Sequence, residues 1–167
     1  NDRSLEVLLR YARNTKDIKI ITMSRVFGVA PCVMAGLAQA QGDAAVYMDA
    51  DLQDPPELIP EMLKAMREQN ADVVHTVRRS RQGESAFKLF ITKIGYRILN
   101  RYSTVPIPQE AGDFKLLSRR VIDNVLLLKE INPFMRGLVA WVGFKQVFIA
   151  YDRQARFAGK SKFFVLG

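Results

Sequence analysis

The residues best suited to chemistry in this 167-residue sequence lie in an acidic segment at positions 48–57, which reads MDADLQDPPE. Asp49 and Asp51 are two positions apart, so along an extended chain their carboxylates project to the same side. With the amide oxygen of Gln53 they form a set of hard oxygen ligands. Such a set suits Mg²⁺ or Mn²⁺, with a nucleotide diphosphate supplying the remaining ligands. The spacing predicts a divalent-metal site, although an isolated Asp-x-Asp pair is as often an ordinary acidic turn.

Positive charge follows this acidic segment along the chain. The sequence has 25 Lys and Arg against 17 Asp and Glu, a net charge of +8, and residues 76–120 hold ten bases and three acids. An acidic loop followed by a basic stretch favours a site that binds a cation and phosphates together. An unevenly charged solvated surface and a nucleic-acid-binding surface are the alternatives.

The scarcity of cysteine and histidine excludes several kinds of structural and catalytic site. One cysteine, Cys32, excludes a disulfide framework and a zinc site built from cysteines, and one histidine makes a His-dependent triad improbable. We interpret His75, Cys32 and Trp141 as structural core residues. The chain opens without an initiator Met or a signal peptide, and we expect it to be an internal piece of a longer protein.

Apolar segments of helical and of strand length alternate, which predicts an α/β fold with a mostly parallel sheet and flanking helices. The acidic segment then follows a strand end, where open α/β sheets bind ligands. Because the chain opens on a helix, we expect the first strand of the fold to be missing. Helices are expected at 1–13, 31–41, 57–69, 85–102, 119–128 and 134–141, and strands at 19–23, 44–48, 71–77, 114–117 and 146–151.

The segment VYMDADLQDPPELIPEM resembles the metal-binding segment of family 2 glycosyltransferases with the A-type fold, a nucleotide-diphospho-sugar transferase fold. Within that family it is most similar to the polyprenol-phosphate sugar transferases, such as dolichol-phosphate mannose synthases and bactoprenol glucosyltransferases. Further similar segments follow in the family's order: SRVFG (24–28), ADVV and RRSR (71–81), AGDFKLL (111–117), FMRGL and WVG (134–143), and RFAGKSK (156–162).

The resemblance implies inverting, metal-dependent transfer of a hexose from a UDP-glucose or GDP-mannose type of donor to a polyprenyl phosphate, undecaprenyl or dolichyl. The reaction would take place on the cytoplasmic face of the cell membrane. Asp49, Asp51 and Gln53 would hold the metal, and Asp51 and Asp113 would act at the reaction centre. The residues implied to bind donor or acceptor phosphate are Arg78, Lys88, Thr92, Arg156, Ser161 and Lys162.

The sequence departs from the family pattern at three neighbouring positions. The family commonly carries Asn before Phe27 and Lys-Glu after Gly28, whereas this chain has Val26, Val29 and Ala30. We therefore expect altered contacts with the donor. The resemblance also implies that residues 1–167 form a single catalytic domain, truncated at its N-terminus and before C-terminal membrane segments, and inactive on its own.

Two other functions fit parts of the sequence. A glycosyltransferase of the same fold could act on a saccharide hydroxyl in cell-envelope polysaccharide synthesis, but it would need a clear catalytic base. A polyprenyl phosphate is largely dianionic near pH 7 and needs none. A basic phosphate- or nucleic-acid-binding module would explain the net charge but not the acidic segment, so we expect no nucleic-acid partner. Homo-oligomer formation is left open by the sequence.

Overall fold

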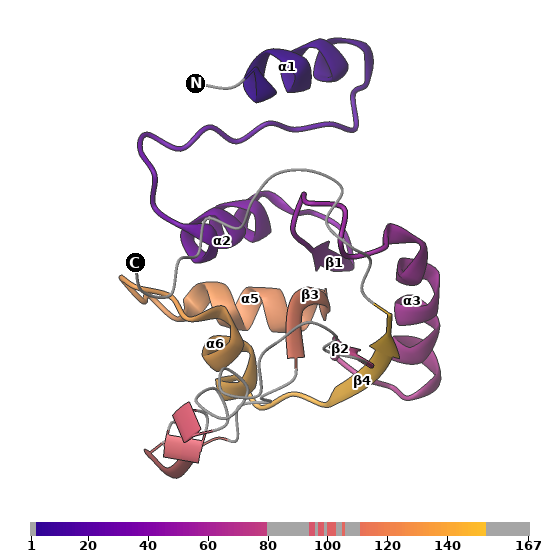
Figure 1. Cartoon of the computed structure of the whole chain (residues 1–167), viewed down its shortest axis with the longest axis vertical. Helices are drawn as coiled ribbons and strands as arrows, with labels where there is room; N and C mark the ends of the chain where they lie inside the picture. The colour runs from indigo at the N-terminus through magenta and orange to yellow at the C-terminus, as the bar shows by residue number, and fades with distance from the viewer. Residues whose placement is uncertain are drawn as a thin grey trace.

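The computed structural model describes residues 3–79, 94–95, 97–98, 100–102, 105 and 111–152 (Figure 1). Its helices are α1 (Ser4–Asn14), α2 (Val29–Gln39), the 3-10 helix η1 (Pro56–Leu58), α3 (Ile59–Glu68), α5 (Arg119–Leu127) and α6 (Met135–Trp141). Its strands are β1 (Ala44–Tyr47), β2 (Val73–Arg78), β3 (Ala111–Ser118) and β4 (Gln146–Tyr151). Within these residues, no helix has both the length and the apolar character needed to span a membrane.

The four strands form one sheet in the order β1-β3-β2-β4. β3 pairs antiparallel with both β1 and β2, whereas β2 and β4 pair in parallel. Three of the four described strands therefore run in one direction, as the sequence predicts, but β3 lies between two of them in the opposite direction. The sequence could not indicate this reversal because the apolar pattern of a strand carries no information about its direction.

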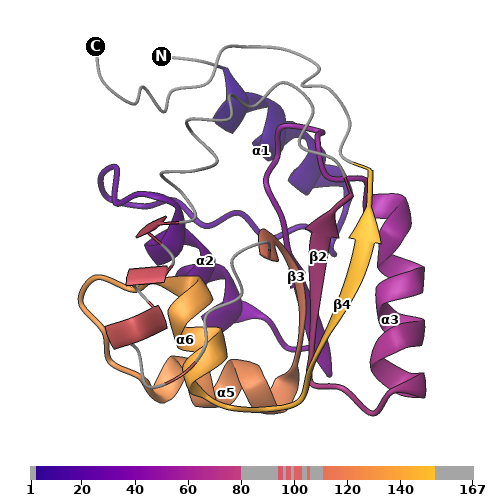
Figure 2. The same cartoon turned by 60° about the horizontal axis from the view of Figure 1, so that its bottom comes forward.

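Helices cover both faces of the sheet (Figures 1 and 2). α3 packs on one face over a cluster that includes Met62, Val74 and Phe114. α2, α5 and α6 cover the other face over a second cluster that includes Leu117 and Val125. Leu116 belongs to the first cluster and its neighbour Leu117 to the second, so adjacent residues of β3 enter opposite cores, as expected for a central strand buried on both faces.

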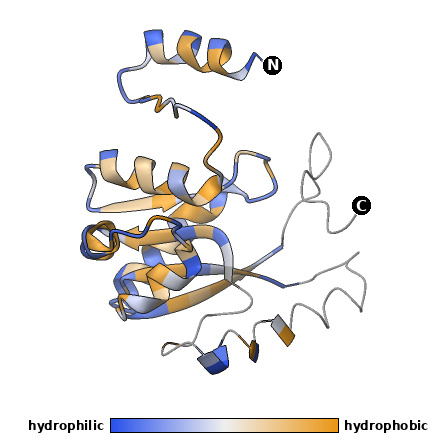
Figure 3. Cartoon of the chain, turned by 90° about the vertical axis from the view of Figure 1, so that its left-hand side faces the viewer, coloured by the Kyte–Doolittle hydropathy of each residue, from blue (hydrophilic) through white to orange (hydrophobic). Residues whose placement is uncertain are grey.

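The strand predicted at 19–23 is not formed. These residues belong to no helix or strand, and Ile21 is 44% exposed. A strand requires a neighbour to satisfy its backbone hydrogen bonds, and no described strand lies beside this segment. The preceding helix α1 buries none of its residues. It lies apart from the sheet and carries both hydrophobic and hydrophilic residues (Figure 3).

Most other predicted elements are confirmed to within a few residues. The helix predicted at 31–41 begins two residues earlier, after Gly28, whose φ of +90° suits glycine. The helix predicted at 85–102 lies largely outside the described residues, and residues 94–95, 97–98 and 100–102 are helical.

The predicted burial of Cys32 and Trp141 is wrong. Cys32 is exposed because α2 packs through Val33 and Leu37, on another face of the helix. Trp141 is 58% exposed because it is the last residue of α6, and the helix reaches the core through earlier residues such as Leu138 and Val139. His75, by contrast, is buried in β2, where its Nε2 lies 2.7 Å from Gln146 Oε1, and this agrees with a structural role.

The buried His75 makes stability depend on pH below neutrality. Burial is the largest influence on its pKa, which falls to about 4 from the ordinary 6.5. Between these values the unfolded chain binds a proton that the folded chain does not, so stability falls as the pH falls. Urea denaturation measures the free energy of unfolding at pH 7 and at pH 4.5. Between these pH values it should fall by about 2–3 kcal/mol more in the wild type than in His75→Gln. Equal losses in the two proteins would contradict the assignment.

Candidate active site

The polar residues of the site converge at one edge of the sheet. Because β3 is antiparallel, its first residues lie at the same edge as the last residues of β1, β2 and β4. Tyr47 pairs with Lys115. Asp49 and Asp113 each lie two positions beyond this pair, so the register brings the acidic loop and Asp113 to the same edge. Arg78, the last residue of β2, lies there too.

The acidic loop after β1 is held by hydrogen bonds at two points. The Gln53 backbone N–H donates to Asp51 Oδ1 at 3.1 Å, forming a tight turn around Leu52, which has a positive φ of 59°. The buried Asp54 accepts a hydrogen bond from the Tyr151 hydroxyl at the end of β4. The loop is therefore fixed to its own backbone and to the far strand of the sheet.

The donor atoms of this loop fit a divalent cation. Asp49 is exposed, whereas Asp51 and Gln53 are half-buried, so the three side chains offer hard oxygens beside open solvent. The described part of the chain contains no cluster of three or more His, Cys, Asp or Glu residues that could hold a metal. Two carboxylates and one amide would supply only part of the shell of an ion such as Mg²⁺, which takes its remaining ligands from water or phosphate, and the metal-binding role of the loop stays a prediction.

Asp113 forms a bidentate ion pair with Arg136 from the start of α6. Arg136 Nε lies 3.0 Å from Asp113 Oδ1, and Nη2 lies 2.8 Å from Oδ2. Burial alone would raise the pKa of the Asp113 carboxyl. The hydrogen bonds and charge of Arg136, together with the charges of Lys115 and Arg78, lower the pKa by more than burial raises it. The net pKa lies below its ordinary value. Asp113 is therefore ionised throughout the neutral range.

Lys115 places a cation inside the protein beneath this ion pair. Its side chain is fully buried, and Nζ donates to Gly112 O at 2.6 Å and lies 3.8 Å from Asp113 Oδ1. Nζ also lies 5.5 Å from the centre of the Tyr47 ring. Burial is the main influence on the Lys115 pKa and lowers it to about 8.

A cavity of about 390 Å³ opens beside Asp113, between the N-terminal ends of α2 and α6. Its polar lining residues are Tyr47, Asp113 and Arg136, and the remaining lining residues are apolar. The Tyr47 hydroxyl is buried and has no hydrogen-bond partner among the described residues. Burial, followed by the charge of Asp113, raises the Tyr47 pKa above its ordinary value. Tyr47 therefore presents an uncharged hydroxyl.

The structure describes one of the six residues implied to bind phosphate. Arg78 lies at the site edge, and its Nε is buried without a partner among the described residues. Its charge also helps to lower the pKa of Asp113. The other residues lie outside the described part of the chain, and their roles stay predictions: Lys88, Thr92, Arg156, Ser161 and Lys162.

Comparison with known proteins identifies the family of this site. The model of a family described as glycosyl transferase family 2 matches residues 1–126, well over half of the chain. The chain belongs to glycosyl transferase family 2.

Several members of the family are similar to the chain in sequence. It is 47% identical over 162 residues to the uncharacterized glycosyltransferase YkcC of Bacillus subtilis, covering 97% of this chain and 50% of the relative. The uncharacterized glycosyltransferase sll0501 of Synechocystis is 44% identical over 161 residues, with coverage of 96% and 50%. A bactoprenol glucosyl transferase of Shigella phage SfV is 40% identical over 143 residues, with coverage of 86% and 46%. The chain spans about half the length of the curated relatives it matches.

Solved structures support the predicted nucleotide-sugar transferase fold. Glucosyl-3-phosphoglycerate synthase from Mycobacterium tuberculosis, crystallised with Mn²⁺, UDP-glucose and phosphoglyceric acid, has a TM-score of 0.50 at 16% identity. The match covers 95% of this chain and 58% of that chain. A mycobacterial protein has a TM-score of 0.51 at 18% identity, with coverage of 95% and 55%. At these identities the likeness shows the fold alone.

The sequence pattern assigns no role to three residues of this family 2 glycosyltransferase site: Tyr47, Lys115 and Arg136. A signal existed for Lys115, because it is a charged residue between Phe114 and Leu116 in an otherwise apolar strand. The residues at 113, 115 and 117 share one face of β3, and Leu117 enters the core beneath α5 and α6. The sequence offers no comparable signal for the Asp113–Arg136 pair.

Lys115→Met gives a stability test of the buried cation. Because the folded-state pKa is about 8 and the ordinary value 10.5, the unfolded chain binds more protons in this interval. The stability of the wild type relative to Lys115→Met should therefore rise by about 2–3 kcal/mol between pH 7 and pH 10.5. Urea denaturation of both proteins at each pH measures the change. If the difference in unfolding free energy between the two proteins did not change with pH, burial would not lower the Lys115 pKa.

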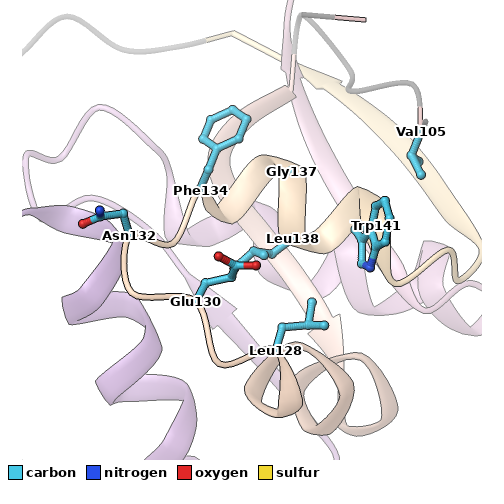
Figure 4. Close-up of a pocket in the computed structure, with 8 residues that line it drawn as sticks. All are labelled: Val105, Leu128, Glu130, Asn132, Phe134, Gly137, Leu138 and Trp141. Atoms are coloured by element: carbon cyan, nitrogen blue, oxygen red, sulfur yellow. The ribbon is translucent and has the colours of Figure 1, made fainter. Parts of the chain in front are cut away.

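A second cavity, of about 340 Å³, lies beside α5 and α6 (Figure 4). Leu128, Leu138 and the exposed Trp141 form much of its wall. Phe134 lines this cavity and also the cavity beside Asp113. A Cβ atom at Gly137 would lie only 2.8 Å from the Phe134 ring, so the absence of a side chain at Gly137 lets Phe134 occupy this position.

Proposed function

We propose that the protein transfers a hexose from a nucleotide-diphosphate sugar to a polyprenyl phosphate. The observation that carries the proposal is the convergence of the acidic loop with Asp113, Arg136 and Lys115 at one edge of the sheet. The bactoprenol glucosyl transferase of Shigella phage SfV, which is 40% identical over 143 residues, supports the choice of acceptor class.

The proposed metal is Mg²⁺ or Mn²⁺, held by Asp49, Asp51 and Gln53. When bound, such a cation neutralises charge on a departing diphosphate. The turn at Asp51 and the Asp54–Tyr151 hydrogen bond keep the loop in place when a ligand arrives. This preorganisation reduces the rearrangement required during the reaction.

The transfer step requires no proton acceptor. An oxygen of the acceptor phosphate dianion attacks the anomeric carbon, and the bond from that carbon to the donor diphosphate breaks. Its electron pair leaves with the nucleotide diphosphate, and attack opposite the leaving group inverts the anomeric configuration. Arg78 and Arg136 supply positive charge where two phosphate groups must approach each other. The ionised Asp113 orients Arg136 and shapes the electrostatic field at the reaction centre.

One observation favours a second candidate, transfer to a saccharide hydroxyl. The Asp113 carboxylate is held ionised and is 41% exposed. It could therefore accept a proton from an attacking hydroxyl. The charge of Arg136 reduces its basicity, however, so we place this function second.

The proposed location is the cytoplasmic face of the cell membrane, where polyprenyl phosphate and nucleotide sugars meet. The experiment expresses the full-length protein in membranes and adds radiolabelled nucleotide sugars with undecaprenyl phosphate, in Mg²⁺, in Mn²⁺ or in EDTA. We expect metal-dependent label in a lipid-phosphate sugar and none in EDTA. Label in a saccharide product without a lipid product would favour the second candidate. No transfer to either acceptor would contradict the proposed function.

A further inference from the structure

The Tyr151 hydroxyl contacts both the acidic loop and Arg78. Tyr151 is the last residue of β4 and is buried, and its hydroxyl donates a hydrogen bond to Asp54 of the loop. In the parallel pair formed by β2 and β4, which lie side by side, Tyr151 is the direct partner of Arg78 (Figure 2). A second hydrogen bond joins the side chains of Arg78 and Tyr151. One hydroxyl therefore links two strands to the loop.

The chemistry of the three groups fixes the direction of these hydrogen bonds. A guanidinium has only donors, an ionised carboxylate has only acceptors, and a tyrosine hydroxyl has one proton and can also accept. Arg78 therefore donates to the Tyr151 oxygen, whose single proton goes to Asp54. Hydrogen bonds connected in this way polarise and strengthen one another. Loss of the bond from Arg78 should consequently weaken the bond that holds the loop.

The hydroxyl keeps its proton in the neutral range. Burial is the largest influence on the Tyr151 pKa and raises it, and the hydrogen bond to Asp54 and the charge of Asp54 raise it further. The hydrogen bond and charge of Arg78 act in the opposite direction, but the pKa stays above its ordinary value. The proton that joins Tyr151 to the loop is thus retained under the conditions in which transfer would occur.

The two groups that Tyr151 joins have complementary roles in the proposed transfer. Asp54 directly follows Gln53, the last of the proposed metal ligands. Arg78 is the proposed phosphate contact, and its buried Nε has no partner among the described residues, so a phosphate oxygen would satisfy it. The metal and this cation act on phosphate groups that meet at one reaction centre, so their separation has to be set before the ligands arrive.

From this arrangement we infer that Tyr151 is a positioning residue, which fixes Arg78 relative to the acidic loop. The inference rests on the proposed function and deepens it by adding a residue to the machinery of the site. Tyr151 is only 5% exposed, so it acts through Asp54 and Arg78. Loss of an outer partner of a metal site typically lowers metal affinity or activity 10- to 100-fold, which sets the size of the expected effect.

The first test removes only the hydroxyl. Tyr151→Phe keeps the ring, which packs edge-on against Phe114 with the ring centres 6.2 Å apart. Mn²⁺ alone is titrated into the purified full-length protein, and free Mn²⁺ is measured by electron paramagnetic resonance. We expect the Kd for Mn²⁺ to rise about 10-fold or more and kcat/KM for sugar transfer to fall by a similar factor.

The matched control for this variant is Ile149→Val. Ile149 lies two positions before Tyr151, on the same face of β4, and is buried in the core cluster that contains Phe114. The change removes one buried carbon from the strand without touching the hydroxyl. A variant that merely loosens β4 should keep the wild-type Kd for Mn²⁺, so the comparison separates positioning from support of the fold.

The second test keeps the hydroxyl and changes no charge. In Arg78→Lys a single ammonium replaces the guanidinium fork, so the contact with Tyr151 is weakened. The Kd for Mn²⁺ should rise several-fold, and it should not rise further when Arg78→Lys is added to Tyr151→Phe. Arg79→Lys is the matched control, because Arg79 is the next residue and its exposed side chain pairs instead with Asp152, at 3.6 Å. It should keep the wild-type Kd.

The outcomes separate this inference from the proposed function. If the wild type binds Mn²⁺ and transfers sugar while Tyr151→Phe behaves like Ile149→Val, the proposed function stands and the inference is wrong. An unchanged Kd in Arg78→Lys, or additive effects of Arg78→Lys and Tyr151→Phe, would also overturn the inference. Arg78→Lys decides the question by itself if Tyr151→Phe does not fold. A wild type that forms no lipid-linked sugar would contradict the proposed function, and the inference with it.

Discussion

Asp51→Asn is expected to lower the rate of sugar transfer by about a thousandfold while leaving the fold intact. A bound cation contributes several kcal/mol to stabilising charge in a phosphate reaction, and each 1.36 kcal/mol changes the rate tenfold. The change suits the structure because an asparagine side chain keeps the oxygen that accepts the Gln53 N–H at 3.1 Å. The turn is thus retained, and the negative charge is removed.

The matched control for this change is Glu57→Gln. Glu57 is the last residue of the acidic segment, lies in η1 and is exposed, and it is not among the proposed metal ligands, so it undergoes the same carboxylate-to-amide change outside the ligand set. Sugar transfer and Mn²⁺-dependent UDP binding are measured in both variants. We expect both to be lost in Asp51→Asn and retained in Glu57→Gln. Retention of metal-dependent binding and transfer in Asp51→Asn would exclude Asp51 as a metal ligand.

The location of the acidic loop could be predicted from sequence because the signal is local. The apolar run at 44–48 ends directly before Asp49, and the structure ends β1 at Tyr47. Strand length, the following acids and the Pro-Pro helix start all lie within about fifteen neighbouring residues. Hydrophobic periodicity therefore placed the loop correctly at a strand end.

The other half of the site depends on contacts between distant parts of the chain. Asp113 and Arg136 are 23 positions apart and meet only because α6 begins beside the first residues of β3. The insertion of β3 between β1 and β2 brings Asp113 to the edge that carries Asp49. Strand direction and order follow from tertiary packing, which hydrophobic periodicity does not encode. The strand predicted at 19–23 is wrong for a related reason, since forming a strand depends on a partner elsewhere in the chain.

Arg136→Ala should lower kcat/KM for transfer by about 100-fold, because it removes a preorganised cation from the reaction centre. Arg136→Lys keeps the charge but loses the bidentate geometry, so its activity should fall between those of the wild type and the alanine variant. Arg79→Ala is the matched control. Arg79 also lies at this edge of the sheet but forms an exposed ion pair, 3.6 Å from Asp152, of a kind that contributes little.

The pH dependence of Arg136→Ala separates an electrostatic role from simple support of the fold. Burial raises the Asp113 pKa, and Arg136 is the largest influence opposing it, so the pKa should rise when Arg136 is removed. In the wild type the lowered pKa stabilises the fold above the unfolded-state value, and this contribution is lost as the pH falls through the folded-state pKa. The stability difference between wild type and Arg136→Ala should therefore be larger at pH 7 than at pH 4.

The acidic limb of the transfer rate should move to higher pH in the same variant, because Asp113 must be ionised to act at the reaction centre. A lower rate with an unchanged pH profile would mean that Arg136 only supports α6. A shifted profile with partial recovery in Arg136→Lys would show that Arg136 acts through the ionisation of Asp113. Lys115, 3.8 Å from the same carboxylate, also lowers the Asp113 pKa, but its influence is smaller than that of Arg136 and its single Nζ cannot form the bidentate contact.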